Sequence, residues 1–570
     1  MQHVEAFVIG RQKAGPSETR LILLASSAMV ALTLFVLLFL QPTYQTNDDA
    51  AMRMTASGLR TGAPSEYLIH INILVGRVLK FLYETSPAVH WYDVYLYGNI
   101  VTAMAAMTFS LLRLSAPRRW LSPVFPVVIY PFVAIQPQFT ITSGLCAGAA
   151  ALLVISSAIQ PPPSRAGWIG LSVLVATCSV LAVSLRSNQA LVVFGVVVLS
   201  ALPLLLVRYG RHLWPGPLLL VLLALGVGFA IHVIAQHEYL KNEGFRQFAE
   251  LNTYRVAIQE YLAPRWQDLG ERAVLEAAGW SVADYRMFFS WFTTNENLFG
   301  LEALKQIRAG LLAIQSPSVG PGIWDMALRE SEILWNRNYL LLGLAAAALL
   351  VLPSRWWGML ALLSAVVASI AAAVVMEYAS KVPPFRVMFP ILICCFTVAV
   401  LFAAPTRSQR VGSSSRLDRA LTAVGFLGLL AAAGFIAADV LRLSGANKTE
   451  IAAIAEDMEN YDGTGRIHVW GLLPRFSSVY YLPPFTSARP FTWVGLGWAT
   501  LAPIEKGKRE ALGLHDLPLD LCTNPDLYHM ADMKNFYILQ EYILQHYHIE
   551  TKAEMVYSGN RLQIYRCVQE

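Results

Sequence analysis

The chain has 570 residues, of which 55% are hydrophobic and only 14% are charged, and its mean hydropathy is +0.48. Soluble globular proteins have about 45–50% apolar and about 25% charged residues, so the composition excludes a soluble enzyme, a disordered chain and a nucleic-acid binder as first interpretations. The formal net charge of +5 would by itself suggest an anionic partner, so the position of the charges along the chain has to be established first.

A helix that spans a membrane needs roughly 20 mostly apolar residues. The stretches that meet or approach this length lie at residues 21–41, 94–112, 120–136, 141–159, 168–185, 189–207, 216–235, 338–353, 357–376, 387–404 and 420–441. Three prolines in the stretch at 120–136 favour a kink or a break, and a re-entrant hairpin formed with 141–159 is an open alternative. The sequence therefore predicts an α-helical polytopic membrane protein with about 11 transmembrane helices.

The short segments between these stretches indicate the orientation of the chain. When the N-terminus is placed in the cytoplasm, the cytoplasmic segments hold 14 lysine and arginine residues and three acidic residues. Cytoplasmic loops carry such an excess of basic residues, so the net charge of +5 reflects topology and not an anionic partner. We therefore expect a multi-pass protein of the inner (plasma) membrane with a cytoplasmic N-terminus and an extracytoplasmic, periplasmic C-terminal domain.

The outer segments are long and make up about half of the chain. They divide the protein into a transmembrane module at 1–441, with outer loops at 42–93 and 236–337, and a small extracytoplasmic α/β domain at 442–570. A protein that only conducts a solute does not need so much structured mass on one face. We therefore expect chemistry or recognition at the outer face of the membrane.

The predicted C-terminal domain contains strand-like segments at 466–471 and 563–567 and an amphipathic helix at 535–546. It also holds Cys522 and Cys567, whereas the other four cysteines lie in predicted spans. In an oxidising compartment this pair is a candidate disulfide, and the alternative is two free buried thiols. The histidines and cysteines show no metal-ligand spacing, so no metal site is predicted.

The first outer loop opens with Asn47, Asp48 and Asp49, a few residues after the first span. Carboxylates are costly near lipid, so we expect them to face an aqueous cavity. Asn and Asp are also good helix N-caps, so one of these side chains can cap a helix while another faces the cavity. Further along, residues 68–83 have apolar side chains at near-helical spacing with polar ones between them, which predicts an interfacial amphipathic helix.

The order of these segments resembles the GT-C class of integral-membrane glycosyltransferases: one span, an outer loop that opens with Asn-Asp-Asp, interfacial helices, many spans and an outer C-terminal domain. This resemblance covers nearly the whole chain. Several local strings are also similar to a bacterial branch of serotype-converting and uncharacterised glycosyltransferases. They are Thr46-Asn47-Asp48-Asp49 with Ser57-Gly58, Thr61-Gly62 and Pro64-Ser65-Glu66, then Gly279-Trp280-Ser281 with Asp284-Tyr285, Phe288 and Trp291-Phe292, and finally Arg386-Val387-Met388-Phe389-Pro390.

The resemblance implies a hexosyl- or pentosyltransferase that moves a sugar from a polyprenyl-phosphate-linked donor to a cell-envelope glycan or glycolipid acceptor at the outer face. In the GT-C class an acidic residue of the first outer loop is the catalytic base, which here implies Asp48 or Asp49 and leaves the choice between them open. One carboxylate suffices, because it takes the proton of the attacking hydroxyl while a phosphate leaving group needs no general acid. Such a single displacement inverts the anomeric centre.

Basic residues at the outer ends of spans are few, which makes them candidates for holding the donor phosphate. They are Arg186, Lys381 and Arg386. The planar guanidinium of arginine presents a bidentate fork that matches a phosphate group. The alternatives are contact with lipid headgroups or an ion pair with Glu377.

Other polar side chains of the outer segments are candidates for substrate contact: Asn47, Arg60, Glu66, His70, Asp284 and Glu377. No cofactor is expected, although a divalent cation at the acidic pair stays open, and neither a Walker A loop nor a dinucleotide fingerprint is visible. The expected partners are the polyprenyl-phosphate-sugar donor, the glycan or glycolipid acceptor and membrane lipid, with no nucleic acid.

The alternative function is a polytopic transporter or flippase of a lipid-linked glycan, and a third is a non-catalytic platform for assembly at the outer face. Transporters often show paired repeats and ionisable residues near the middle of their spans. The centres of the predicted spans are nearly free of charge and no repeat is visible, which favours the enzyme.

Overall fold

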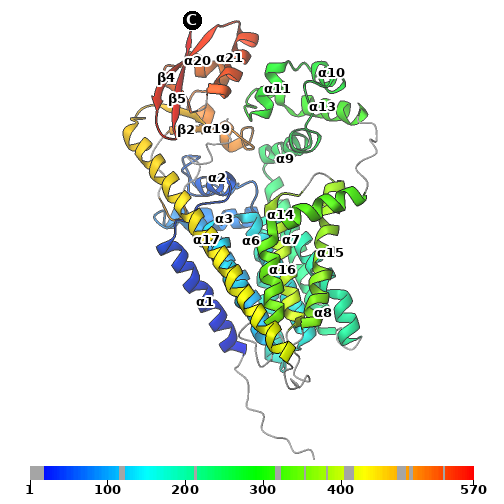
Figure 1. Cartoon of the computed structure of the whole chain (residues 1–570). Coiled ribbons are helices and arrows are strands. Elements are labelled where there is room, and N and C mark those ends of the chain that lie inside the picture. Colours follow the sequence, from blue (N-terminus) through cyan, green and yellow to red (C-terminus); the bar gives the residue numbers. More distant parts are fainter. Residues whose placement is uncertain are drawn as a thin grey trace, which may run out of the picture.

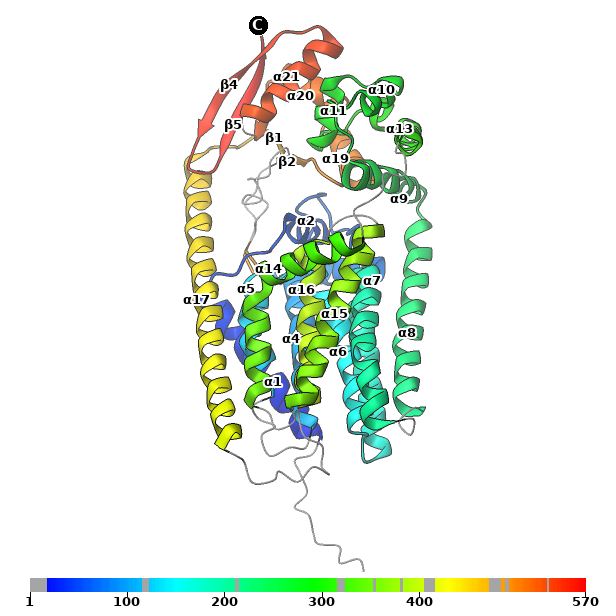
Figure 2. The same ribbon diagram turned by 45° about the vertical axis from the view of Figure 1, so that its right-hand side comes forward.

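The computed structural model describes residues 18–114, 122–210, 215–314, 323–351, 355–379, 383–403, 416–470, 483–486, 492–530 and 533–570. Within these ranges, eight helices are long and apolar enough to cross a membrane, which confirms a polytopic α-helical membrane protein. They are α1 (Glu18–Phe39), α4 (Trp91–Arg113), α6 (Phe139–Ile159), α7 (Arg165–Tyr209), α8 (Pro215–Leu240), α15 (Arg355–Ala379), α16 (Phe385–Ala403) and α17 (Arg416–Asn460). Two shorter apolar helices, α5 (Val124–Ile135) and the Leu341–Leu350 part of α14 (Ile323–Val351), lie in the same bundle (Figures 1 and 2).

The long helix α7 folds back on itself and therefore accounts for two of the predicted spans. Its backbone leaves the helical conformation at Arg186, where φ is −161° and ψ is 98°. Trp168, near the start of α7, packs against Gly216, which lies just beyond its end, so the two arms are antiparallel. With these arms counted separately and with α5 and α14 included, the helices correspond segment by segment to the eleven predicted stretches.

Helix α17 is longer than the span predicted at 420–441. It continues to Asn460 and carries the chain from the bundle to the C-terminal sheet (Figure 2). Near its end, Asp457 accepts backbone N–H bonds from Asn560 at 2.7 Å and Leu562 at 2.8 Å, in the turn between the last two strands. Hydropathy marks only the apolar part of a helix, so the boundary expected at residue 442 falls inside this element, and the division into domains stays a prediction.

The first outer segment forms two short helices between the bundle and the outer cap, α2 (Asn47–Ala56) and α3 (Ile73–Thr85) (Figure 1). Helix α3 begins later than the predicted start at residue 68, because Ile69 has a left-handed backbone conformation with φ at 68°. The side chain of Asn72 caps α3 by accepting the backbone N–H of its second residue at 2.8 Å.

The outer cap consists of two groups of elements. The second outer segment forms α9 (Glu243–Val256), a π-helical turn (Ala257–Leu262), α10 (Leu269–Ala277), α11 (Val282–Phe289), α12 (Glu296–Phe299) and α13 (Leu301–Ile314). The C-terminal part forms β1 (Ile467–Trp470), β2 (Thr492–Gly495), α19 (Pro503–Ala511), α20 (Leu517–Thr523), β3 (Leu527–Met530), α21 (Met533–Tyr547), β4 (Thr551–Ser558) and β5 (Gln563–Gln569). The strand order is β2-β1-β3-β5-β4, in which β1 is parallel to β2 and β3, whereas β5 is antiparallel to β3 and β4.

Hydrophobic cores join the two groups to each other and to the membrane bundle. Trp280 and Phe288 of the outer helices belong to the same core as Leu521 of the C-terminal part. A second core joins Met52 of α2 to Ile564 of the sheet. The first outer loop is therefore enclosed between the bundle and the sheet, which fixes the position of α2.

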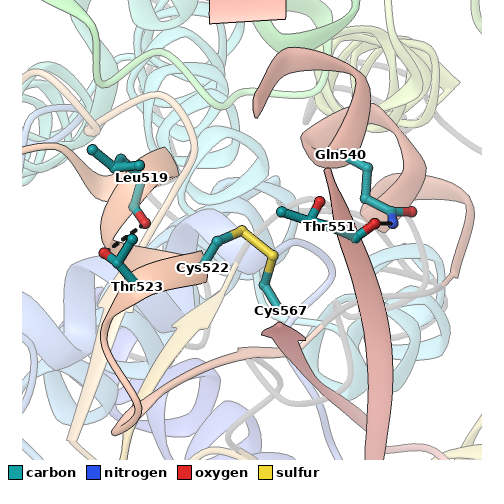
Figure 3. The surroundings of a disulfide bond; sticks show 6 residues. All are labelled: Leu519, Cys522, Thr523, Gln540, Thr551 and Cys567. Carbon is teal, nitrogen blue, oxygen red and sulfur yellow. Dashed lines mark hydrogen bonds between the residues drawn. A yellow bond between two sulfur atoms is a disulfide. The ribbon is translucent and has the colours of Figure 1, made fainter. Parts of the chain in front are cut away.

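Cys522 of α20 and Cys567 of β5 form a disulfide (Figure 3). It ties a helix to the antiparallel part of the sheet. The other four cysteines are free and buried in the helices of the bundle.

Candidate functional site

The two adjacent aspartates at the start of α2 have different surroundings. Asp49 is fully buried and accepts hydrogen bonds from the hydroxyl of Tyr92 at 2.8 Å, the backbone N–H of Phe139 at 3.1 Å and the hydroxyl of Thr46 at 3.3 Å. Burial raises the pKa of Asp49 well above its ordinary value; the Tyr92 bond opposes this rise and the charge of Asp48 adds to it. Asp49 thus connects α2 to α4 and α6 and does not face a cavity.

Asp48 is partly exposed, with 16% of its side chain accessible. Its Oδ1 atom accepts a hydrogen bond from the indole Nε1 of Trp498 at 3.1 Å, and its Oδ2 atom lies 3.8 Å from Nη1 of Arg386. The cap position of α2 is occupied by Thr46, so neither Asn47 nor Asp48 serves as the N-cap that the sequence allowed. Asp48 is therefore the carboxylate of the pair that is available to a substrate.

His70 lies close enough to Asp48 and to three arginines for their charges to change its pKa. Its ring stacks on Phe139 with 5.6 Å between centroids and lies 4.5 Å from the Trp498 ring. Burial lowers the pKa of His70 to about 4; the charge of Asp48 opposes this shift, and the guanidinium groups of Arg186, Arg255 and Arg386 add to it. The imidazole is therefore neutral near pH 7.

Two of these arginines are those predicted at the outer ends of spans. Arg186 is at the turn between the arms of α7, where its guanidinium donates to Thr140 Oγ1 at 2.8 Å and lies 5.6 Å from the Phe139 ring. Arg386 is the second residue of α16, and its buried Nε atom has no hydrogen-bond partner among the residues that the structure describes. The alternative pairing of Arg386 with Glu377 is not the arrangement found, because Glu377 forms an ion pair with Arg329 of α14.

Arg255 of α9 is the third arginine, and no pattern in the sequence identifies it. It is buried and donates to Asn252 Oδ1 at 2.7 Å and Gln259 Oε1 at 2.7 Å, and it lies 4.8 Å from the ring of Trp291. These hydrogen-bond partners are neutral amides, and burial lowers the pKa of Arg255 to about 10, against the opposing charge of Glu260. No motif surrounds this residue in the sequence, and only the packing of α9 over the bundle brings it to the site.

The other candidates for substrate contact differ in position. Arg60 is buried in an ion pair with Glu505 of α19 and lies 5.7 Å from the Trp498 ring, so it borders the cluster. Asn47 is exposed at the first residue of α2. Glu66 forms an ion pair with Lys80 at 2.8 Å.

Asp284 and Glu377 are engaged elsewhere. Asp284 is fully buried, forms the capping box of α11 with Ser281 and accepts a hydrogen bond from Nε2 of His546 at 2.8 Å. Through these contacts Asp284 stabilises the start of α11 and joins it to α21. Lys381, the remaining candidate for phosphate binding, lies outside the described residues.

Together, Asp48, His70, Arg186, Arg255 and Arg386 form a cluster at the boundary between the bundle and the outer cap. Three guanidinium groups outnumber the two carboxylates whose charges act on them, Asp48 and Glu260, so the cluster has a net positive charge that suits an anionic ligand such as a phosphate. In the part of the chain that the structure describes, no three His, Cys, Asp or Glu side chains come together as metal ligands. That no cofactor is needed stays an expectation.

Comparison with known proteins gives a distant structural likeness. No family model and no curated protein matches the chain. Two solved structures of ArnT from Cupriavidus metallidurans, one in the apo state and one bound to undecaprenyl phosphate, are similar to it over 96% of this chain and 98% of theirs. Their sequence identities are 13% and 12%, each with a TM-score of 0.40, so the site is interpreted from this chain's own residues.

Proposed function

We propose that the protein is a membrane glycosyltransferase of the GT-C type that transfers a sugar from a polyprenyl-phosphate-linked donor to a cell-envelope glycan or glycolipid. The observation that carries this proposal is the partly exposed carboxylate of Asp48 beside Arg386, Arg186 and the neutral His70. A base and a set of cations within one cluster are the two elements that this reaction requires.

Asp48 is the proposed general base. Its Oδ1 atom is held by Trp498, and its Oδ2 atom is 3.8 Å from Arg386, which is too long for a hydrogen bond. Among the described residues Oδ2 forms no hydrogen bond, so we propose that it accepts the proton of the acceptor hydroxyl. As that proton leaves, the acceptor oxygen bonds to the anomeric carbon and the bond from that carbon to the donor phosphate oxygen breaks, which inverts the anomeric centre.

Arg386 and Arg186 are the proposed ligands of the donor phosphate. The phosphate gains negative charge as it leaves, and nearby guanidinium groups stabilise that charge in a site with little water. The Nε atom of Arg386 has no partner in the described part of the chain, which supports this role, because a buried guanidinium nitrogen without a partner is costly unless a ligand supplies one. Arg255, whose charge also acts on His70, adds positive charge to the cluster.

The proposed orientation places this cluster at the outer face, with the N-terminus in the cytoplasm. The basic segments between the spans support it. The disulfide between Cys522 and Cys567 also supports it, because disulfides persist in oxidising compartments such as the periplasm.

The proposal is tested by replacing each aspartate with asparagine. Asp48→Asn removes the base without a change of size, so we expect cells that carry it to lose one sugar from an envelope glycan by mass spectrometry, as cells without the protein do. The loss in turnover is expected to be about 10²-fold or more, as for other general bases. Asp49→Asn retains the size and part of the hydrogen bonding of a buried group, so it should act mainly through the amount of folded protein.

The amount of folded protein is measured in parallel by size-exclusion chromatography in detergent. Unchanged envelope glycans in Asp48→Asn cells that contain normal amounts of the protein would contradict the proposed function.

A further inference from the structure

Trp498 comes from the C-terminal part of the chain but contacts the first outer loop. It lies in the connection between β2 and α19, at the carboxyl end of a parallel strand. Its indole N–H donates to Asp48 Oδ1 at 3.1 Å. The C-terminal part thus provides a hydrogen-bond donor to the proposed catalytic base.

The backbone around Trp498 is held by its own hydrogen bonds. Gly497 has φ at 127°, and its N–H donates to the hydroxyl of Thr500 at 2.8 Å. The carbonyl of Thr500 accepts a bond from Nη1 of Arg509 at 2.7 Å, and Thr500 and Arg509 are both buried. This arrangement fixes the loop on α19 and leaves little freedom for Trp498 to move away from Asp48.

Side chains of the first outer loop pack around the indole ring. The ring of His70 lies 4.5 Å from it, and the guanidinium of Arg60 lies 5.7 Å from it. Arg60 is in turn fixed by a buried ion pair with Glu505 of α19. The direction of the indole N–H is therefore determined by residues of both the first outer loop and α19.

We infer that Trp498 is a positioning residue that holds the carboxylate of Asp48 so that Oδ2 faces the acceptor hydroxyl, an inference that rests on the proposed function. A carboxylate on a short side chain can otherwise rotate and pair fully with Arg386 at the expense of proton transfer. Holding one oxygen with a neutral donor restricts this rotation and leaves the second oxygen free. The C-terminal part is accordingly a component of the active site.

Trp498→Phe tests this inference, because phenylalanine retains an aromatic ring but has no N–H group. Initial rates are measured with polyprenyl phosphate that carries the sugar missing from the envelope of Asp48→Asn cells. We expect kcat to fall by about 10- to 100-fold, the effect of losing one hydrogen bond to a charged group, while KM for the donor stays within about 2-fold of wild type.

Trp266→Phe is the matched control. Trp266 is a partly buried tryptophan of the outer helices that packs on Tyr285 and Arg272, away from the cluster. Its substitution should leave kcat and KM unchanged. Thermal unfolding of both variants in detergent reports whether the fold is preserved.

The outcomes separate this inference from the proposed function. If Asp48→Asn removes a sugar from the envelope but Trp498→Phe retains the kcat of wild type, the inference is wrong and the proposed function stands. A rise in donor KM or a loss of folded protein that accounts for the whole defect would also overturn the inference, because Trp498 would then act through binding or folding. If Asp48→Asn changes no glycan, the proposed function itself fails.

Discussion

Successive residues on an α-helix point about 100° apart, so neighbouring side chains at the start of α2 enter different surroundings. Asp49 is directed into the protein and accepts three hydrogen bonds, whereas Asp48 is directed toward the arginines of the cluster. Burial raises the pKa of Asp49, but its side chain is fully enclosed and its oxygens accept bonds from the fold, so an acceptor hydroxyl cannot reach it. The difference in partners therefore supports the proposal that Asp48 is the base and that Asp49 stabilises the fold.

Substitution of Arg386 by alanine tests its proposed role in binding the donor phosphate. Because 34% of its side chain is exposed and its Nε atom has no hydrogen-bond partner among the described residues, Arg386→Ala should leave folding intact. We expect turnover to fall by about 10²- to 10³-fold, as when one charge-stabilising group is removed from an active site. Arg77→Ala is the matched control, because Arg77 belongs to a partly exposed ion pair of α3 outside the cluster. Wild-type turnover in Arg386→Ala would exclude phosphate binding by this residue.

At the scale of elements, the loop between α2 and α3 decides how Asp48, Arg60 and His70 are arranged. It turns at Gly58 and Gly62, which have φ at 82° and 81°. A Cβ atom at Gly58 would lie 2.7 Å from the backbone of Ala63 and Pro64, whereas one at Gly62 would meet nothing within 4 Å. Both glycines therefore have a left-handed backbone, but only Gly58 lacks room for a side chain.

This difference gives a prediction with an internal control. Gly62→Ala should cost about 1–2 kcal/mol of stability, from the left-handed backbone alone. Gly58→Ala adds a clash with backbone atoms, so it should cost more and should lower turnover by displacing Arg60 from the Trp498 ring. Thermal unfolding and transfer rates in detergent measure both effects. Equal stability of the two variants would show that the loop relaxes without cost.

The elements differ in how well the sequence predicts them. Apolar runs of membrane length predicted the helices of the bundle, because lipid allows few other structures for such runs. The later start of α3 depends on the left-handed conformation of Ile69, which hydrophobic periodicity does not report. Trp498 and Arg255 reach the site through contacts between segments far apart in the chain, so no local pattern could identify them. The sequence points to Arg386 because basic residues at the outer ends of spans are rare, whereas for the acidic pair the resemblance leaves Asp48 and Asp49 open and their surroundings in the structure distinguish them.

At the scale of the whole molecule, the bundle and the outer cap share cores, so acid should act on them together. In the cap, buried histidines make the free energy of unfolding depend on pH. His529 lies in β3 and is fully buried, with both ring nitrogens lacking partners among the residues that the structure describes. Burial lowers the pKa of His529 to about 3, well below the ordinary value of 6.5.

The lowered pKa predicts a loss of stability in acid. Between pH 6.5 and about 3 the unfolded chain binds a proton at His529 and the folded chain does not, so the free energy of unfolding decreases as the pH falls. This group should account for about 2 kcal/mol between pH 7 and pH 5. His529→Phe removes the titrating group and keeps an aromatic ring, so its melting temperature in detergent should fall less over this interval than that of wild type. His548→Asn, at an exposed position, should follow the wild-type curve. The raised pKa of Asp49 has the opposite effect on stability in acid, but Asp49 is present in all three proteins, so its effect cancels in the comparison. Parallel curves for wild type and His529→Phe would show that His529 is already protonated or solvated in the folded protein.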